Sequence, residues 1–489
     1  MTDRPAAVPP APPLTDAAAL RAAGRHPAAP FRVRLADGRE TELTVHRLLR
    51  VLPGKRVVGE AVDADGARRL VKLFIDGHSE RNWQRERDGI AALAAAGVPT
   101  PALVAAGPLA GGGHALLTDF LDGADTLLDG WHPLAGAMPG DGQFAAATAL
   151  LAPAFALLGQ AHVAGLSHDD LHFGNFLRHD GRLLLIDGDA VRRHGPGPLA
   201  EGTAARDLAL LLAQLPRTWD GHLDALLAAY RLTNPRPPGN GALQRALTKA
   251  RAWRLQDYLG KTGRDCTLFK VERTPDRYSA VVRGEADALA PLLAGPDRAI
   301  DAGHLLKRGN TCTVARVEAD GRPLVVKRYN IKNARHALSR LWRPSRGWHS
   351  WREGHRLRLF GIPTPAPLAL VEERRGPLRG RAWLVNEYCA GTDLLTLLDA
   401  DREPPPDVAA ALVAIFATLH RERISHGDLK ATNLLWDGRT VQFIDLDAMR
   451  QHRSQATHAR AWRRDRERLL RNWPEGSALH RWLDAHLPG

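Results

Sequence analysis

The feature that most constrains this chain is a long motif that occurs twice, once in each half. "SHDDLHFGNFLRHDGRLLLIDGDAV" begins at Ser167, and "SHGDLKATNLLWDGRTVQFIDLDAM" begins 258 residues later at Ser425. The flanking segments recur in the same order: "GVPTP" and "GIPTP" are 264 residues apart, and the lysines of "LVKLF" and "VVKRY", Lys72 and Lys327, are 255 apart. Because the spacing drifts by only a few residues, the pattern indicates a tandem domain duplication and not a short-period repeat.

Both halves show the same local pattern. "RRLVKLF" and "RPLVVKRY" are apolar runs that follow an Asp-Gly pair, which is typical of a strand entered through a hairpin turn. An apolar helical segment precedes each repeated motif, and a second Asp-Gly pair divides the residues after it into two short strands. Each half is therefore expected to have an α+β fold, with a strand-rich lobe followed by a helical lobe that carries a hairpin at its mouth.

Chain length and the Pro-rich segments predict the domain boundaries. A chain of 489 residues exceeds one ordinary hydrophobic core. The start of the chain is rich in Pro and Ala, and "NPRPPGNG" from Asn234 marks a break before a helical segment. We predict a disordered tail over residues 1–30, a first domain over 31–240, a helical linker over 241–261 and a second domain over 262–489.

An uncharged stretch over residues 142–167 is long enough to cross a bilayer. It contains Pro153, Gln160 and His162, and much of it is Ala, so we interpret it as a buried helix that leads into the first motif. The cysteines, Cys266, Cys312 and Cys389, form no CxxC pair, which indicates neither a zinc site nor a disulfide framework.

The repeated segments supply, in order, the groups that phosphoryl transfer requires. A strand lysine can neutralise the α/β-phosphates of ATP, and a loop aspartate can accept the hydroxyl proton. An asparagine and a second aspartate can bind Mg²⁺ through oxygen. These groups are Lys72, Asp170, Asn175 and Asp187 in the first half and Lys327, Asp428, Asn433 and Asp445 in the second. The two aspartates are 17 residues apart in both halves, so the sequence predicts ATP and Mg²⁺ at two sites.

With these motifs, each half resembles a protein-kinase-like domain, and the whole resembles the lipopolysaccharide core kinase family, the Kdo and heptose kinases. "SHGDLKATNLLW", "FIDLDAM" and the Arg-rich "RAWRRDRERLLRNWP" of the second half carry the resemblance most specifically. It implies two tandem protein-kinase-like bilobal domains, each with a β-rich N-lobe and a helical C-lobe, and the same roles for the eight residues above. It also implies that Lys430, two residues after Asp428, meets the γ-phosphate.

Kinases pair the strand lysine with a glutamate on a helix, and each half offers one candidate. In the first half Glu86, in "NWQRERDGIAAL", stands eleven residues before "GVPTP". In the second half the candidate is Glu353, which stands eight residues before "GIPTP". That difference is nearly one helical turn, so an ordinary surface glutamate is the alternative for Glu353.

Charge points to an anionic acceptor. The formal net charge is +13. Residues 327–358 contain ten Lys/Arg and one acidic residue, with Trp342, Trp348 and Trp351 interleaved, and residues 450–489 contain nine Arg and four acidic residues. A glycolipid core at the anionic inner membrane face suits both clusters, because Arg binds phosphates and Trp suits a membrane interface. Solvated basic helices are the alternative, and no nucleic-acid fold signature occurs.

The resemblance and the residues together predict an ATP-dependent kinase of heptose or Kdo hydroxyls in the lipopolysaccharide inner core. It would act in the cytoplasm, peripherally at the inner membrane, and no oligomeric state is predicted. A protein or small-molecule kinase is one alternative. Two features argue against a protein kinase. Asp189 and Asp447 stand where protein kinases carry the Gly of DFG, and no APE-like segment follows. The other alternative is a scaffold in which one or both kinase-like domains are pseudokinases.

Overall fold

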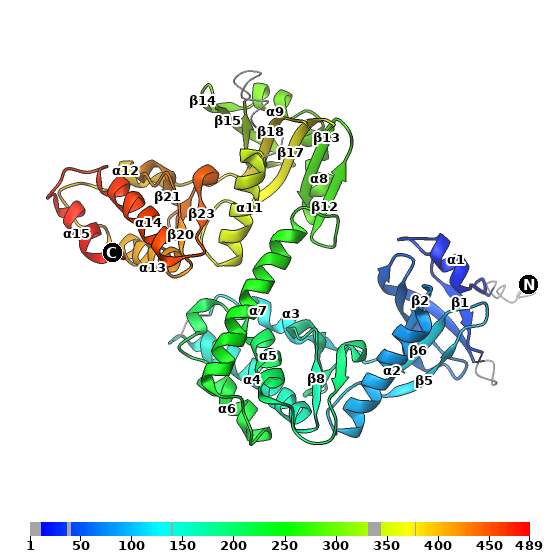
Figure 1. Cartoon of the computed structure of the whole chain (residues 1–489). Coiled ribbons are helices and arrows are strands. Elements are labelled where there is room, and N and C mark those ends of the chain that lie inside the picture. Colours follow the sequence, from blue (N-terminus) through cyan, green and yellow to red (C-terminus); the bar gives the residue numbers. More distant parts are fainter. Residues whose placement is uncertain (1–10, 37–40, 138–139, 331–343, 377) are drawn as a thin grey trace, which may run out of the picture. The chain divides into compact units, whose positions relative to one another are not determined.

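The computed structural model describes residues 11–36, 41–137, 140–330, 344–376 and 378–489. The chain divides into two compact units, Met1–Ala252 and Trp253–Gly489, which are described separately. The division falls inside helix α7 (Asn240–Lys261). Each unit combines one antiparallel sheet with a mainly helical part, in agreement with the expected α+β class (Figure 1).

The first unit begins with a six-stranded antiparallel sheet. Its strands are, in spatial order, β1 (Phe31–Arg34), β2 (Glu42–Leu52), β3 (Arg56–Val62), β4 (Arg68–Phe74), β6 (His114–Asp119) and β5 (Leu103–Pro108). Alternate residues of β3 are buried, as expected for a strand with one face on the core. Helix α2 (Ser79–Ala95) packs against β5 and β6 (Figure 1). The predicted strand "RRLVKLF" is β4, and it places Lys72 beside Leu116 of β6.

The prediction of a disordered tail over residues 1–30 is wrong for residues 11–30, while residues 1–10 lie outside the described part of the chain. Helix α1 (Ala17–Ala22) forms there, and the Asp16 side chain caps it by accepting the Ala19 amide at 2.8 Å. Ala17 and Leu20 are buried in the core of the first sheet. The segment is ordered because burial of this short apolar face compensates the entropy of fixing it.

The helical part of the first unit surrounds one long helix, α4 (Gly142–Val163). The other elements are β7 (Asp125–Thr126), α3 (Leu127–Trp131), β8 (Leu166–His168), η2 (Phe173–Asn175), β9 (Phe176–His179), β10 (Arg182–Leu185), η3 (Gly188–Ala190), β11 (Val191–Arg193), α5 (Glu201–Leu212) and α6 (Asp224–Thr233). Strands β9 and β10 form the predicted hairpin, with the Asp180-Gly181 turn in the left-handed region.

Helix α4 is the one helix among the described residues that is long and apolar enough to cross a membrane by length and composition. Leu151, Phe155 and Leu158 of α4 are buried in the core of the first unit. These contacts agree with the interpretation of the uncharged stretch as a core helix.

The second unit begins with a seven-stranded antiparallel sheet. Its strands are, in spatial order, β12 (Phe269–Arg273), β13 (Arg277–Val282), β17 (Pro367–Arg375), β18 (Leu378–Glu387), β16 (Arg322–Tyr329), β15 (Cys312–Ala319) and β14 (His304–Arg308). Both faces of its central strands are covered, because neighbouring residues such as Leu384 and Val385 belong to different core clusters. Helices α8 (Ala286–Ala294) and α9 (Pro296–Ala302) pack against β15, whereas α11 (Arg346–Leu359) packs against β17 and β18.

The helical part of the second unit repeats the element order of the first. Its elements are β19 (Thr392–Asp393), α12 (Leu394–Leu397), α13 (Pro406–Arg421), β20 (Ile424–Ser425), η6 (Ala431–Asn433), β21 (Leu434–Trp436), β22 (Val441–Phe443), η7 (Leu446–Ala448), β23 (Arg450–Gln451), α14 (Gln455–Leu470) and α15 (Ala478–His486). Strand β20 pairs with β23, and β21 pairs with β22, as β8 pairs with β11 and β9 with β10.

The tryptophans of the first basic cluster have structural positions where the structure describes them. Trp351 is fully buried in the core between α11 and the sheet, and Trp348 packs against the same cluster. Trp342 lies in the segment 331–343, outside the described residues. The expectation that these rings suit a membrane interface is therefore wrong for Trp351, because the amphipathic α11 turns this ring toward the sheet.

A glycine contact that joins the two parts of the first unit provides a stability test. A Cβ atom on Gly89 of α2 would lie 1.9 Å from the carbonyl oxygen of Gly188 in η3. We expect Gly89→Ala to lower the free energy of unfolding by about 1–3 kcal/mol, because backbone on both sides must shift. Urea denaturation measures this change. Gly77→Ala, where a Cβ would have no atom within 4 Å, is the control, and equal effects of the two variants would contradict the prediction.

Burial of His355 predicts a pH-dependent stability of the second unit. Its ring lies 4.2 Å from Trp351 between ring centroids, and burial lowers the pKa of His355 from 6.5 to about 3. Between these values the unfolded chain takes up a proton that the folded chain refuses, so the free energy of unfolding falls as the pH drops through this window. The slope is about 1.4 kcal/mol per pH unit. We expect His355→Phe to remove this slope in denaturation measured from pH 7 to pH 4, whereas an unchanged slope would show that other groups cause it.

Candidate active site

In the first unit a buried aspartate fixes the loop that carries Asp170. The main-chain N–H of His168 donates to the Oδ2 atom of Asp207 on α5 at 2.8 Å, and Asp207 is fully buried. The side-chain amide of Asn175 donates to the carbonyl oxygen of Asp170 at 2.8 Å. The loop is therefore held from both ends, and the carboxylate of Asp170 is left with 64% of its side-chain surface exposed.

The second unit has the same contacts, each shifted by 258 residues. The N–H of His426 donates to Asp465 of α14 at 2.6 Å, and the Asn433 amide donates to the carbonyl oxygen of Asp428 at 2.8 Å. Burial lowers the pKa of His426, which keeps the ring neutral. Its Nε2 atom lies 3.0 Å from the carbonyl oxygen of Ile444, so Nε2 carries the proton, and Nδ1 accepts the main-chain N–H of Asp428. The matching hydrogen bonds thus support the duplication independently of the sequence similarity of the motifs.

The sequence reasoning missed the two aspartates that hold these loops. Asp207 and Asp465 lie 39 residues after the loop histidines in both units. Their signal was present, because "ARDLA" and "RRDRE" both place Arg-Asp at the offset of 258 residues. Extending the alignment beyond the motif would have found them.

The expected metal-binding residues are brought together at the mouth of each hairpin. The N–H of Ile186 donates to the carbonyl oxygen of Asn175 at 2.9 Å, which makes Asn175 and Asp187 near neighbours, and Ile444 joins Asn433 to Asp445 in the same way at 3.0 Å. Both Asp187 and Asp445 have left-handed backbones, with φ values of 72° and 59°. Such strain in a non-glycine residue concentrates at functional sites.

The strand lysine of the first unit has the expected helix partner. Lys72 on β4 forms an ion pair with Glu86 on α2, and its Nζ atom lies 3.8 Å from the Oδ1 atom of Asp187. Glu86 is fully buried, and Arg56 approaches its second oxygen at 3.7 Å. The lysine is therefore positioned between the sheet and the hairpin mouth.

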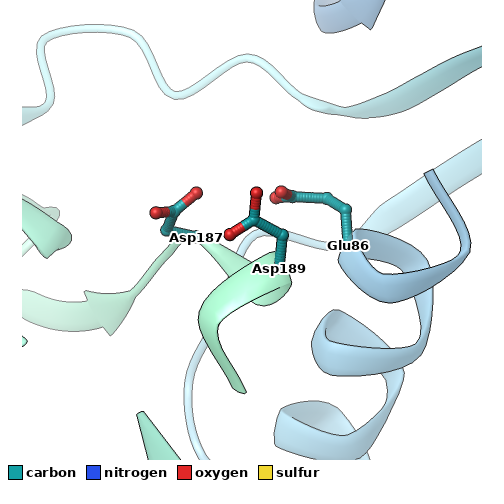
Figure 2. A group of neighbouring side chains, drawn as sticks. All are labelled: Glu86, Asp187 and Asp189. Carbon is teal, nitrogen blue, oxygen red and sulfur yellow. The ribbon is translucent and has the colours of Figure 1, made fainter. Parts of the chain in front are cut away.

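Three carboxylates meet beside this lysine. Ligand atoms of Glu86, Asp187 and Asp189 all lie within 4.8 Å of one another, and Figure 2 shows the three carboxylates pointing toward a common region. Burial raises the pKa of Asp189, and the charges of Asp187 and Glu86 raise it further. Carboxylate and amide oxygens are the ligands that Mg²⁺ prefers, and the Oε2 atom of Glu86 is buried without a hydrogen bond. The donor set therefore fits a divalent cation.

The lysine of the second unit has different partners. Lys327 on β16 contacts Asp445 at 2.6 Å and Asp447 at 2.9 Å. Among the described contacts Glu353 does not reach Lys327, because it pairs with Arg356 at 2.8 Å. The residue eleven positions before "GIPTP", which corresponds to Glu86, is Ser350, and its hydroxyl donates to Asp447 at 2.7 Å. The predicted pairing of Glu353 with Lys327 is therefore absent from this conformation, because Glu353 lies one turn too far along α11.

This arrangement leaves the second site compact. Burial alone would lower the pKa of Lys327, but Tyr329, Asp447 and Asp445 together raise it above its usual range. Burial raises and Lys327 lowers the pKa of Asp445, with a net shift downward. The cavity lined by Lys327, Ser350 and Asp445 measures about 60 Å³. Ligand pockets are typically about 300–1,000 Å³, so this cavity alone is too small to enclose a nucleotide.

The two loop aspartates have different surroundings. Asp428 forms ion pairs with Arg468 of α14 and with Lys430, the latter at 3.1 Å, and 30% of its side chain is exposed. Asp170 has His172 at 3.9 Å. The sequence reasoning missed Arg468. The residue that corresponds to it at the offset of 258 is Leu210, so among the described contacts only the second unit places an arginine on this aspartate.

Part of the chain matches a known family. Residues 299–482 match the model of the lipopolysaccharide kinase (Kdo/WaaP) family. Similar curated proteins include 3-deoxy-D-manno-octulosonic acid kinases of Stenotrophomonas maltophilia strains K279a and R551-3, each 37% identical over 139 residues. The matched region is 27% of this chain and 53% of each kinase, so the chain spans about half the length of the curated relatives it matches.

The chain also shows a weak similarity to solved structures, with TM-scores below 0.5. WaaP in complex with acyl carrier protein is 23% identical, with a TM-score of 0.32, over 43% of this chain and 86% of that chain. The kinase domain of Mycobacterium tuberculosis PknI is 22% identical, with a TM-score of 0.29, over 43% of this chain and 88% of that chain. The family match confirms the resemblance that the motifs indicated: over residues 299–482, the second unit is similar to the lipopolysaccharide kinase (Kdo/WaaP) family.

Proposed function

We propose that the protein is an ATP- and Mg²⁺-dependent kinase that phosphorylates a sugar hydroxyl, of Kdo or heptose, in the lipopolysaccharide inner core. The observation that carries this proposal is the family match, because residues 299–482 contain Lys327, Asp428, Asn433 and Asp445. The hydrogen bond from Asn433 to the Asp428 carbonyl and the ion pair of Lys327 with Asp445 support one proposed site for these four residues.

The reaction assigns one role to each group. Asp428, and Asp170 in the first unit, orients the acceptor hydroxyl and accepts its proton. The hydroxyl oxygen forms a bond to the γ-phosphorus, the bond from that phosphorus to the β-phosphate oxygen breaks, and ADP leaves. Lys327 and Lys72 hold the α/β-phosphates, and Lys430 holds the γ-phosphate.

The metal ligands of the proposal are Asn433 and Asp445 in the second unit and Asn175 and Asp187 in the first. Bound Mg²⁺ would neutralise the phosphate oxygens. Glu86 serves the first site by holding Lys72, and the buried cluster with Asp189 offers further oxygen ligands.

The proposed architecture is a tandem pair of protein-kinase-like domains that correspond to the two compact units, with the division inside helix α7. The predicted linker over 241–261 is not a separate element, because Leu243 and Leu247 of α7 pack in the core of the first unit. The recurrence of four hydrogen bonds at the same offset supports the tandem pair: the loop amide to a buried aspartate, Asn to loop carbonyl, His to hairpin carbonyl, and hairpin amide to Asn carbonyl. Neither unit lacks a residue of the Lys–Asp–Asn–Asp set, so we propose that both catalyse transfer.

The acceptor is proposed to be the lipopolysaccharide core glycolipid, met in the cytoplasm at the anionic inner membrane face. The net charge of +13 and the arginines of α14 support an anionic acceptor and surface. No role for nucleic acid is proposed.

A scaffolding role for the second unit is the second candidate function. The pairing of Lys327 with Asp445 and Asp447, together with the small cavity beside them, favours it. A pseudokinase second unit would leave Asp170 as the only catalytic aspartate. ATP-dependent transfer that survives in Asp428→Asn and disappears in Asp170→Asn would favour this reading.

The loop aspartates give the central test. On purified core glycolipid with ATP and Mg²⁺, we expect Asp428→Asn and Asp170→Asn each to lower transfer at one sugar position by roughly 10²- to 10⁴-fold, because the proton acceptor is lost. Mass analysis of the core phosphates identifies the position that each variant loses.

The double variant should transfer no phosphate, and full activity of the double variant would refute the assignment. Asp180→Asn is the matched control. Its side chain is 85% exposed at a hairpin turn, and asparagine tolerates its left-handed backbone. Phosphate on a protein substrate and not on glycolipid would favour a protein kinase.

The two helix glutamates make a second test, in nucleotide binding. We expect Glu86→Gln to weaken ATP·Mg²⁺ binding to the first unit about tenfold, because Lys72 loses its charged partner. Glu353→Gln should leave nucleotide binding to the second unit unchanged, because Glu353 pairs with Arg356.

Each variant is measured with the lysine of the other unit replaced by Met, so that a fluorescent ATP analogue reports one site at a time. A loss in Glu353→Gln as large as that in Glu86→Gln would mean that Glu353 reaches Lys327 when nucleotide binds.

A further inference from the structure

A cavity of about 310 Å³ lies beside the catalytic loop of the second unit. Its lining includes Ser425, Gly427, Arg450, Arg464, Arg468 and Arg471, together with the carboxylates of Asp465 and Glu467. It shares no lining residue with the cavity beside Lys327. The cavity is therefore separate from the groups proposed to hold the nucleotide, and Arg468 connects it to Asp428.

The corresponding arginines of the first unit hold an internal anion. Arg192 and Arg206 correspond to Arg450 and Arg464 at the offset of 258 residues. The Nε atom of Arg192 lies 2.9 Å from Oδ2 of Asp169, and the Nη2 atom of Arg206 lies 3.2 Å from Oδ1 of the same side chain. Two guanidinium groups thus clamp one carboxylate, with one arginine on each oxygen.

The second unit keeps both arginines and lacks the carboxylate. Gly427 stands where the first unit has Asp169. Its φ of +79° is left-handed, its N–H donates to Asp465 at 2.9 Å, and a Cβ here would lie 2.6 Å from the carbonyl oxygen of Ala448. An aspartate side chain therefore cannot take the position it has in the first unit. Within the described part of the chain, Arg450 and Arg464 have no acidic partner at salt-bridge distance.

We propose that Arg450 and Arg464 bind an oxyanion of the acceptor, a carboxylate or a phosphate on the sugar, in the place that Asp169 fills in the first unit. This inference rests on the proposed function, because it takes the acceptor to be a glycolipid that presents its hydroxyl to Asp428. Arginine forks bind both kinds of oxyanion through paired, charge-assisted hydrogen bonds. The site selects an acidic or phosphorylated sugar, and Arg468 orients it relative to the catalytic loop.

The first experiment measures turnover by the full chain. We expect Arg450→Gln and Arg464→Gln each to raise the KM for purified core glycolipid by about tenfold, with kcat falling far less, because a charged hydrogen bond in the bound state is lost. Arg463→Gln is the matched control, since Arg463 is an exposed neighbour on α14 that does not line the cavity. Unchanged KM in both arginine variants, with transfer intact, would overturn the inference.

The source of the oxyanion is separated by two modified glycolipids. Enzymatically dephosphorylated core keeps its carboxylates, and carboxyl-reduced core keeps its phosphates. The modification that removes the KM difference between the wild type and the Arg450→Gln variant identifies the bound group. A KM difference that survives both modifications would overturn the inference.

A direct binding measurement keeps the inference testable if glycolipid is not phosphorylated at all, which would refute the proposed function alone. Inorganic phosphate is titrated into the full chain and followed by ³¹P NMR. We expect binding that the Arg450→Gln/Arg464→Gln double variant loses and Arg463→Gln keeps. In that double variant, Asp169→Ala should restore phosphate binding, because it frees Arg192 and leaves Arg206 with Asp207 as its remaining acidic partner. Equal binding by the double variant and the control would overturn the inference.

Discussion

Both sites depend on one interaction, the acceptance of loop amides by a fully or nearly buried aspartate. Burial of Asp207 or Asp465 as an unpaired charge would have a large desolvation cost. Each buried carboxylate therefore accepts hydrogen bonds from nearby donors. Asp207 accepts the main-chain N–H of His168 and the Arg206 side chain, and Asp465 accepts the main-chain N–H groups of His426 and Gly427. Hydrogen bonds to charged groups contribute about 1.5–3 kcal/mol each, which is enough to fix the short loop that carries the candidate catalytic aspartate. The helix that follows the hairpin, α5 or α14, is thus the support of the site.

The partner of the strand lysine differs between the two units, and one helix residue accounts for the difference. A buried ammonium needs a carboxylate, and in the first unit Glu86 supplies it from α2. In the second unit Ser350 occupies that helix position, so Lys327 takes Asp445 and Asp447 from the hairpin mouth. Under the proposed function, Mg²⁺ would compete with Lys327 for Asp445 in the second unit, whereas in the first unit the lysine is already neutralised. In the unit that matches the kinase family, the lysine is therefore paired directly with a proposed metal ligand.

The sequence could predict those parts of the fold that leave a local, repeated pattern. Strands β4 and β16, the Asp-Gly hairpins and the core helix α4 follow from apolar periodicity and turn chemistry over a few residues. The same reasoning failed for α1 and for Trp351, because composition suggested a tail and an interface while tertiary contacts bury both. Asp465 and Arg468 were missed for a related reason. Their roles arise only when α14 folds back onto a loop about 40 residues earlier, and no spacing within the motif encodes that contact.

The loop has Asp169 in the first unit and Gly427 in the second, and this one difference changes both the loop's backbone hydrogen bond and its charge. In the first unit the loop amide of Asp169 bonds to the carbonyl of Ala190, and the side chain neutralises two arginines. In the second unit the glycine turns its amide to Asp465 instead, and the same change removes the carboxylate. Arg450 and Arg464 line one cavity and are exposed, so solvent or a bound ligand supplies their counter-anion in place of an internal carboxylate. The second unit thus has two arginines in the lining of one cavity where the first unit pairs its arginines with an internal carboxylate, and the proposed oxyanion of the acceptor would take the place of that carboxylate.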